Sequence, residues 1–302
     1  MAQNGATVAD DMKKIREVDF VRRFTHESLK KLVEVLGVTR KIPMQEGTTM
    51  YYYTMDGTLA NGNVAEGEII PLTEIEQHKV PVGEISLNKW RKAVTAEAIK
   101  KSGRDTAVRE TDEKLLKLVQ NGFRTDFFNY LNGTITGATQ VVGSGLQAGL
   151  AKAWGQLQVL FEDDDVEAVY FLNPLDVAEY LESAQISTQT VFGMKYIEDF
   201  LGLGTVILSA RITKGTFLAT AKDNFIMYYL TMNGDLADTF DLTADELGYI
   251  GISSGHINTE RAQVESLVMD GIQFLVEYAT GVVKGTITSS TTTDDDSEDT
   301  GA

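Results

Sequence analysis

The clearest pattern in the chain is a long helical repeat of apolar positions. Between residues 105 and 131 apolar side chains recur every four positions, and two further residues widen the stripe. Acidic residues gather at its start and basic residues follow, an order that suits the helix dipole. We predict one helix over 105–131, ended by Gly133 and roughly 40 Å long at ~1.5 Å per residue, more than twice the usual length. Its apolar stripe is Leu115, Leu116, Val119, Phe123, Phe127, Phe128 and Leu131.

The N-terminal region predicts an arm followed by a short helix. Residues 1–18 are mostly polar and offer no apolar face wide enough to fold alone, so we expect an extended arm. After the arm, Thr25 suits a helix N-cap and Gly37 suits a helix end, and the apolar residues between them keep helical spacing. These apolar positions are Leu29, Leu32, Val33 and Leu36.

Residues 41–92 change to an extended pattern. Residues 48–54 are β-branched and aromatic, and Asp56-Gly57 is a turn dipeptide. Glycines and prolines then interrupt the segment until a second alternating run begins at 84–90. We predict a long two-stranded excursion with a flexible tip. Because an isolated hairpin is marginal in water, the body of the subunit or a neighbouring chain must support it.

The middle of the chain predicts a compact α/β block. Residues 145–162 carry a helical pattern, and Ala168–Leu172 is a continuous apolar run typical of a buried central strand. Asn173 and Pro174 suit the cap and the first position of the next helix. Further strands are expected at Thr205–Ser209, Thr216–Thr220 and Phe225–Leu230.

The C-terminal region contains a second extended part and a tail. Residues 246–287 return to alternating apolar and polar positions, and we expect them to pair with the region of the long helix. The end of the chain is rich in threonine and serine and then in aspartate and glutamate. Because a block of like charges repels itself, we predict that residues 288–302 are disordered.

Composition and charge narrow the classes of function. The 302 residues are 43 % hydrophobic and 24 % charged, which is typical of a globular protein. The absence of cysteine excludes disulfides, thiolate metal sites and a cysteine nucleophile. A net charge of −17 argues against nucleic-acid binding by charge neutralisation. No apolar run approaches the ~20 residues that span a bilayer, and the polar N-terminus carries no signal core, so we expect a soluble protein made in a reducing compartment.

One segment resembles a cofactor-binding motif. Gly143-Ser144-Gly145-Leu146-Gln147-Ala148 matches the G-x-G-x-x-A loop that dinucleotide folds place at a helix N-terminus. No βαβ unit precedes it, however, and the next strand ends in Asn173 where the motif needs an acidic residue. Three aspartates at 163–165 come before that strand instead. We therefore favour a flexible loop that opens a helix, and a nucleotide-dependent enzyme stays as an alternative.

The other candidate sites offer no chemistry that the sequence supports. A group of oxygen-bearing residues misses the calcium-loop spacing, which favours a solvated turn. The three histidines are far apart, and both tryptophans lie in amphipathic segments that predict core anchors. We expect a protein that is not an enzyme, with no catalytic residue, metal or cofactor. The calcium candidates are Asn233, Asp235, Asp238 and Asp241, the histidines are His26, His78 and His256, and the tryptophans are Trp90 and Trp154.

The order of these segments resembles the Hong Kong 97-type major capsid protein of tailed phages. Residues 48–92 look like that family's extended loop, and Arg104–Leu131 looks like its spine helix. Ala168–Asp176 resembles the axial-domain strand that runs into Asn-Pro and a helix. Asp245–Gly251 followed by Glu265–Asp270 resembles the passage back into the peripheral domain. The similarity covers residues 15–287, and the ordered set of motifs carries it.

The resemblance implies an α+β capsid fold with a defined division of the chain. In this division an N-terminal arm and short helix precede an extended loop, and a peripheral domain with the spine helix surrounds an axial domain. The implied ranges are 1–40 for the arm and helix, 41–93 for the loop, 94–133 and 246–287 for the peripheral domain, 134–245 for the axial domain and 288–302 for the disordered acidic tail.

The resemblance also implies a function and partners. It implies a structural shell protein that assembles into hexamers and pentamers around packaged double-stranded DNA, formed in the bacterial host cytoplasm and located in the virion. The implied partners are further copies, a portal, decoration proteins and, since only about 15 residues precede the similarity, a separate scaffolding protein. No membrane partner is implied. Some members cross-link through a loop lysine; Lys79 is the corresponding candidate, and its partner is not identified.

An encapsulin, which is a bacterial shell that encloses a cargo enzyme, shares this fold and is the nearest alternative. The long excursion at 48–92 and the acidic tail favour a virion over an encapsulin.

Overall fold

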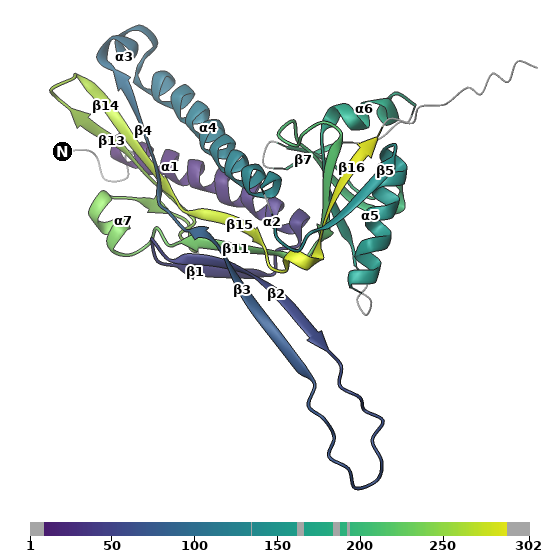
Figure 1. Cartoon of the computed structure of the whole chain (residues 1–302). Coiled ribbons are helices and arrows are strands. Elements are labelled where there is room, and N and C mark those ends of the chain that lie inside the picture. Colours follow the sequence, from purple (N-terminus) through teal and green to yellow (C-terminus); the bar gives the residue numbers. More distant parts are fainter. Residues whose placement is uncertain (1–8, 134, 162–165, 184–187, 192–193, 289–302) are drawn as a thin grey trace, which may run out of the picture.

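A computed structural model of the chain describes residues 9–133, 135–161, 166–183, 188–191 and 194–288 (Figure 1). It mixes helices and sheets, which confirms the predicted α+β class. Within the described ranges the α-helices are α1 (Ala9–Arg22), α2 (Lys30–Leu36), α3 (Ala96–Ser102), α4 (Arg104–Asn132), α5 (Leu146–Leu160), α6 (Pro174–Ser183) and α7 (Asp235–Phe240). The strands there are β1 (Arg40–Met44), β2 (Thr49–Thr58), β3 (Glu74–Glu84), β4 (Asn88–Thr95), β5 (Thr139–Ser144), β6 (Ala168–Leu172), β7 (Gln189–Val191), β8 (Met194–Ile197), β9 (Gly204–Leu208), β10 (Thr216–Ala221), β11 (Phe225–Leu230), β12 (Thr243–Ala244), β13 (Ile250–Asn258), β14 (Gln263–Asp270), β15 (Ile272–Val276) and β16 (Val282–Thr288).

The long helix is confirmed nearly to the residue. Helix α4 has 29 residues and buries every position of the predicted apolar stripe. Gly133 follows its last residue, and the N–H of Gly133 donates to the carbonyls of Asn129 and Tyr130, both at 3.1 Å. The spacing of apolar residues predicted this helix correctly because the whole stripe packs into the main core.

The predicted α/β block centres on one large sheet. In the described residues seven strands pair in the order β5-β16-β10-β6-β9-β8-β7, and α5 packs against β5 and β16. Strand β6 is buried at all five positions, as its apolar run predicted. The N–H of Leu175 donates to Asn173 Oδ1 at 3.0 Å, so Asn173 caps α6 and Pro174 takes its first position, as expected.

Two strands belong to sheets other than those the sequence suggested. Strand β11 was expected within the α/β block but pairs with β1 and β15 in a separate three-stranded sheet. Strand β16 was expected near the long helix but pairs with β5 and β10 in the large sheet. The expected pairing of 246–287 with the long-helix region holds for β14, which pairs with β4, and for β15, which packs on α4. An apolar run shows that a strand is buried but not which strand will lie beside it.

A cluster of phenylalanines joins these parts into one core. Phe127 on α4 contacts Phe171 of β6 at a ring-centroid distance of 5.7 Å. It also contacts Phe225 of β11 at 6.0 Å and Phe274 of β15 at 6.2 Å. Because one side chain touches strands of two sheets, the long helix and both sheets share the same buried interior.

The expected extended arm at 1–18 is wrong where the structure describes it. Residues from Ala9 onward form α1, which continues through a π-helical turn at Arg23–Leu29 into α2. Thr25 lies buried inside this turn and does not cap a helix, whereas Gly37 ends the helix with φ of +65°, as predicted. Residues 9–18 have no apolar face at helical spacing, so the sequence did not predict α1. Contacts with β12 and β13 stabilise this helix.

The predicted two-stranded excursion is confirmed, although two details differ. The Asp56-Gly57 dipeptide does not turn the chain but lies within β2, opposite Glu76 and Ile75 of β3. The expected strand 84–90 is divided between β3 and β4, which belong to different sheets. Thr288, expected to be disordered, ends β16, and the rest of the predicted tail lies outside the described residues.

Candidate functional site

The most prominent surface feature is the excursion formed by β2, β3 and the residues 59–73 that join them. The two strands pair antiparallel from Thr49 and Glu84 near the body to Thr58 and Glu74 at the far end. Figure 1 shows that this ribbon projects from the rest of the molecule into solvent. The excursion is therefore supported by its own subunit at one end only.

The base of the excursion is fixed by a few hydrogen bonds and buried side chains. The N–H of Tyr53 donates to the carbonyl of Glu277 at 2.9 Å, and the hydroxyl of Tyr228 donates to the carbonyl of Tyr51 at 3.2 Å. Tyr52, 5 % exposed, joins the main core. These contacts anchor β2 to the body and leave most of β3 exposed.

The far part of the excursion carries apolar side chains that its own subunit does not cover. Their exposed fractions range from 69 to 95 %. Large apolar side chains gathered in this way on a narrow ribbon indicate a surface that another molecule covers. The residues are Leu59, Ile69, Ile70, Leu72 and Ile75.

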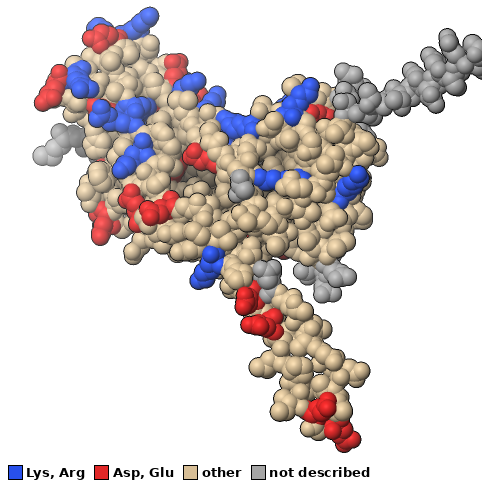
Figure 2. All heavy atoms as spheres, viewed as in Figure 1, with Lys and Arg blue, Asp and Glu red and all other residues tan. Residues whose placement is uncertain are grey.

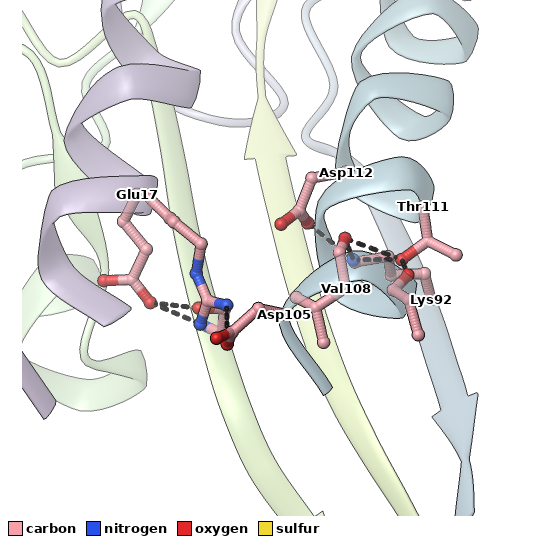
Figure 3. A network of polar contacts seen from close by, with 9 residues as sticks. Glu17, Lys92, Asp105, Val108, Thr111 and Asp112 are labelled. Atoms are coloured by element: carbon pink, nitrogen blue, oxygen red, sulfur yellow. Dashed lines mark hydrogen bonds and ion pairs between the residues drawn. The ribbon is translucent and has the colours of Figure 1, made fainter. Parts of the chain in front are cut away.

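A polar network holds α1 against the body (Figure 3). Glu17 of α1 is only 4 % exposed. Its Oε1 accepts from the Ser254 N–H at 2.8 Å and from the Ser254 hydroxyl at 2.6 Å, and its Oε2 accepts from the Thr243 hydroxyl at 2.9 Å. One buried carboxylate thus accepts hydrogen bonds from residues of two strands, β12 and β13.

The same network continues between α4 and β4 (Figure 3). The ammonium group of Lys92 donates to the Thr111 hydroxyl at 2.8 Å and to the Val108 carbonyl at 3.2 Å. It also forms an ion pair with Asp112 at 2.5 Å. Burial lowers the pKa of Lys92, and the hydrogen bond to Asp112 opposes that shift. These polar groups bind one another and not an outside ligand, which is typical of a structural contact. We call the contacts of Glu17 and Lys92 the polar clamp.

Replacing Glu17 tests whether this clamp stabilises the subunit. We expect Glu17→Ala to lower the free energy of unfolding by about 2–4 kcal/mol, because the Ser254 N–H is then buried without an acceptor. Glu17→Gln keeps one acceptor oxygen and should lose less. Urea unfolding measures both, and Glu27→Ala, at an exposed position of the neighbouring helical turn, is the control. Equal losses in Glu17→Ala and Glu27→Ala would contradict the clamp.

The glycine-rich segment 143–148 opens a helix as expected, with Gly145 directly before α5, but it is not the flexible loop that we predicted. Gly143 lies in β5, and the N–H of Gly145 donates to the Thr288 carbonyl of β16 at 2.9 Å. A Cβ on Gly143 would stand 2.3 Å from the backbone of Gly149 in α5. The glycine therefore permits a strand and a helix to cross in contact, which accounts for the motif through packing.

The residues weighed for calcium surround the short helix α7. Asn233, Asp235, Asp238 and Asp241 are all exposed, as expected for solvated positions, but part of the segment is helical where we expected a turn. The Asn233 amide donates to two backbone carbonyls, at 3.3 and 3.2 Å. Across the described ranges, no three His, Asp or Glu side chains converge on a position for a metal ion.

The histidines and the loop lysine do not meet in one place. His26, His78 and His256 are exposed and lie on separate elements. His256 shares a 2.7 Å hydrogen bond with the Ser253 hydroxyl. The ammonium group of Lys79 lies 5.8 Å from the centre of the Tyr53 ring across the excursion.

The two tryptophans differ in their surroundings. Trp90 is half-buried and packs against the main core, as predicted. Trp154, also expected in the core, is 40 % exposed and lines a groove of about 1070 Å³ with Lys31 and Glu34. The prediction for Trp154 is wrong because α5 turns the positions Ala153 and Leu157 inward and leaves Trp154 on its flank.

Sequence reasoning missed the polar clamp entirely. Glu17 meets Ser254 across 237 positions of sequence and Thr243 across 226. Its local neighbours gave no sign of burial, since residues 1–18 are mostly polar. Only the long-range pairing of strands brings these groups together.

Comparison with family models gave no match, and comparison with curated proteins gave none either. Within the described residues, no helix combines the length and apolar character needed to cross a membrane.

Solved structures, in contrast, resemble this chain over most of its length. A virus-like particle protein from Pyrococcus furiosus has a TM-score of 0.50 at 14 % identity and covers 92 % of this chain and 99 % of its own. The SrpI encapsulin of Synechococcus elongatus PCC 7942 has a TM-score of 0.52 at 12 % identity, covering 88 % and 90 %. The capsid protein of cyanophage P-SCSP1u has a TM-score of 0.51 at 10 % identity, covering 85 % and 88 %.

These similarities cover 85–92 % of this chain. Identities of 10–14 % support a shared fold and no closer relationship. The chain has the Hong Kong 97-type fold that phage capsid proteins and encapsulins share.

Proposed function

We propose that this chain is the major capsid protein of a tailed bacteriophage, a structural subunit without catalytic activity. Copies assemble into hexamers and pentamers of an icosahedral shell that encloses double-stranded DNA without reading its sequence. Assembly takes place in the cytoplasm of the bacterial host, and the shell becomes part of the virion.

The observation that carries this proposal is the excursion on a capsid-type fold. Its apolar side chains are 69–95 % exposed, and its own subunit holds only its base. Since five such side chains in water are unfavourable, a neighbouring subunit that buries them explains why the chain maintains them. A shell supplies such a neighbour to every copy.

We further propose that the segments of the chain take the roles of the capsid family. The excursion within 41–93 is the extended loop, and α4 is the spine helix of a peripheral domain. The large sheet with α5 and α6 is the axial domain, to which we now add β16 because it pairs there with β5 and β10. The partners in this proposal are other copies, a scaffolding protein, a portal and decoration proteins.

Expression of the protein followed by electron microscopy tests the proposal. We expect closed shells of uniform diameter when the subunit is produced with the other head genes of its source, and sedimentation should show a single large species. DNA or scaffolding protein should copurify. A protein that stays monomeric under all assembly conditions, with its excursion intact, would contradict a shell function.

An encapsulin shell is the second candidate, and one observation favours it. The SrpI encapsulin has a TM-score of 0.52 and is matched over 90 % of its own chain, so most of an encapsulin subunit fits this architecture. The contents of purified shells separate the two candidates. One abundant enzyme inside the particles supports the encapsulin, whereas DNA, a scaffold or a portal supports the virion.

A further inference from the structure

Two arginines meet where the long helix joins the α/β block. Arg124 lies on α4 and Arg211 lies in the connection between β9 and β10. Both guanidinium groups donate to the same acceptor, Asn121 Oδ1, Arg211 at 2.6 Å and Arg124 at 3.5 Å. Two positive groups are therefore held side by side by one neutral oxygen.

The position of Arg211 is set by further contacts. Its Nε donates to the Thr125 hydroxyl at 3.3 Å, and the Asn132 amide donates to its carbonyl at 2.8 Å. Asn121, Thr125 and Asn132 all belong to α4, so the helix that carries Arg124 also orients Arg211. The pair is preorganised before any ligand arrives.

The charge of this pair is not compensated within the part of the subunit that the structure describes. Arg16, Arg22, Arg23, Arg40 and Arg91 each have a carboxylate within ion-pair distance there. Arg124 and Arg211 have none in that part, as is also true of Arg104, Arg109 and Arg261, but of these five only Arg124 and Arg211 share one acceptor. The Nε of Arg124 is buried there without a hydrogen-bond acceptor. Burial and the nearby Arg211 both lower the pKa of Arg124, which is the expected response to unpaired positive charge.

A planar carboxylate suits such a site. Guanidinium groups donate two parallel hydrogen bonds to a carboxylate or a phosphate, and such bonds are stronger than those between neutral groups. An oxyanion bound by the outer nitrogens of Arg124 and Arg211 would reduce the repulsion between the two groups. The site is therefore built for one anionic group from outside the described subunit.

We propose that Arg124 and Arg211 bind a carboxylate of the excursion of a second copy of this chain. This inference rests on the proposed shell function. The excursion bears the five exposed glutamates Glu66, Glu68, Glu74, Glu76 and Glu84, and Lys79 is its one Lys or Arg between residues 57 and 84. Figure 2 shows acidic groups near the base of the excursion and at its far end, with basic groups on the body.

Phosphates of DNA fit the same two side chains less well. The subunit carries a net charge of −17, which repels a polyanion, and nucleic-acid binding needs cations spread along a groove more than one isolated pair. The excursion, by contrast, must already contact a neighbour to cover its apolar residues. Its carboxylates consequently reach a neighbouring body at high effective concentration.

Charge reversal and its rescue test this inference. We expect the double variant Arg124→Glu, Arg211→Glu to keep its melting temperature within a few degrees and to lose shell yield by about tenfold or more. A chain that also carries Glu66→Lys and Glu68→Lys, or Glu74→Lys and Glu76→Lys, should recover shells, because the opposite charges then face each other. The control is Lys114→Glu, Lys117→Glu, which makes the same charge change at exposed positions of α4 and should assemble normally.

The outcomes separate this inference from the shell proposal itself. Unaltered chains that form no shells contradict the shell proposal. If unaltered chains form shells but neither pair of Glu→Lys changes restores assembly of the arginine variant, the inference is wrong and the shell proposal stands. Normal shells from the arginine variant that retain less DNA would assign the pair to phosphate and also overturn it.

Discussion

Shells should fail to form when residues 59–73 are replaced by Asn-Gly, while the subunit itself stays folded. Thr58 and Glu74 are opposite one another at the end of the ribbon, so a two-residue turn can close the hairpin without changing the register of β2 and β3. The deletion removes Leu59, Ile69, Ile70 and Leu72, which contact nothing in the core of their own subunit.

The size of this effect follows from the apolar area that is lost. Fully burying one large apolar side chain contributes roughly 1.5–3 kcal/mol, so four of them in each subunit supply much of what a contact between neighbours needs. Ordering the flexible residues offsets part of that gain. A shell repeats the contact in every subunit, and the loss is therefore cooperative. Light scattering and electron microscopy should detect no closed particles.

Two further variants identify the cause of that loss. Ile69→Ser, Ile70→Ser and Leu72→Ser together keep the length of the excursion and should also abolish assembly if apolar burial is responsible. Asn61→Ala with Asn63→Ala changes exposed polar residues in the same segment and should have no effect. Normal shells from the deleted chain would show that the excursion is not an assembly element.

The second large effect concerns Asp270, which is 1 % exposed at the end of β14. Its Oδ1 accepts from the Asn88 amide at 3.1 Å, and its Oδ2 is buried without a hydrogen-bond partner in the described structure. Burial raises the pKa of Asp270 from 3.8 to about 7, and the nearby Asp126 contributes to the same direction. Above about pH 7 the folded subunit therefore carries an unfavourable ionised group at Asp270.

The sign of the pH dependence follows from this raised pKa. Between pH ~4 and 7 the folded state binds a proton that the unfolded state has released, so stability falls as the pH rises. A shift from 3.8 to about 7 is roughly 3 pH units, and at about 1.4 kcal/mol per unit the cost above pH 7 has an upper bound near 4 kcal/mol. Neutralising the side chain should remove that cost.

We expect Asp270→Asn to stabilise the subunit by about 1–3 kcal/mol at pH 8 and to change it little at pH 4. The amide can keep its hydrogen bond to Asn88, and its volume matches the carboxyl group. Urea unfolding at the two pH values measures the difference, with Asp223→Asn at an exposed position as the control. The same pH dependence in Asp270→Asn and in the unaltered chain would contradict the assignment.

The sequence predicted those elements whose own residues determine their environment. Helix α4 has one apolar face along its 29 residues, and β6 is apolar at all five positions. In both elements the apolar pattern alone predicts which residues are buried. The excursion was also predictable, because β-branched and aromatic residues flank a segment rich in glycine. In each case a pattern within the segment is enough to predict the element, although distant parts of the chain supply its contacts.

The features that the sequence did not predict depend on distant partners. Helix α1 is held by Glu17, whose acceptor oxygens are used by strands more than 220 positions away. The arginine pair likewise joins positions 124 and 211 through Asn121, and no local pattern in either segment indicates that they meet. Strand β16 is as apolar as its neighbours, so only the observed register assigns it to the large sheet. Candidate sites in this protein are therefore properties of the tertiary fold.

The phenylalanine cluster around Phe127 has a mechanical consequence. Because one side chain packs against β6, β11 and β15, rotating the large sheet relative to the small one would open a void in a close-packed interior. The body therefore resists bending as one stiff block. The excursion, a ribbon two strands wide with its anchoring at one end, has far less bending stiffness. Copies that meet at different angles would absorb the strain in this ribbon, while the shape of the block stays constant.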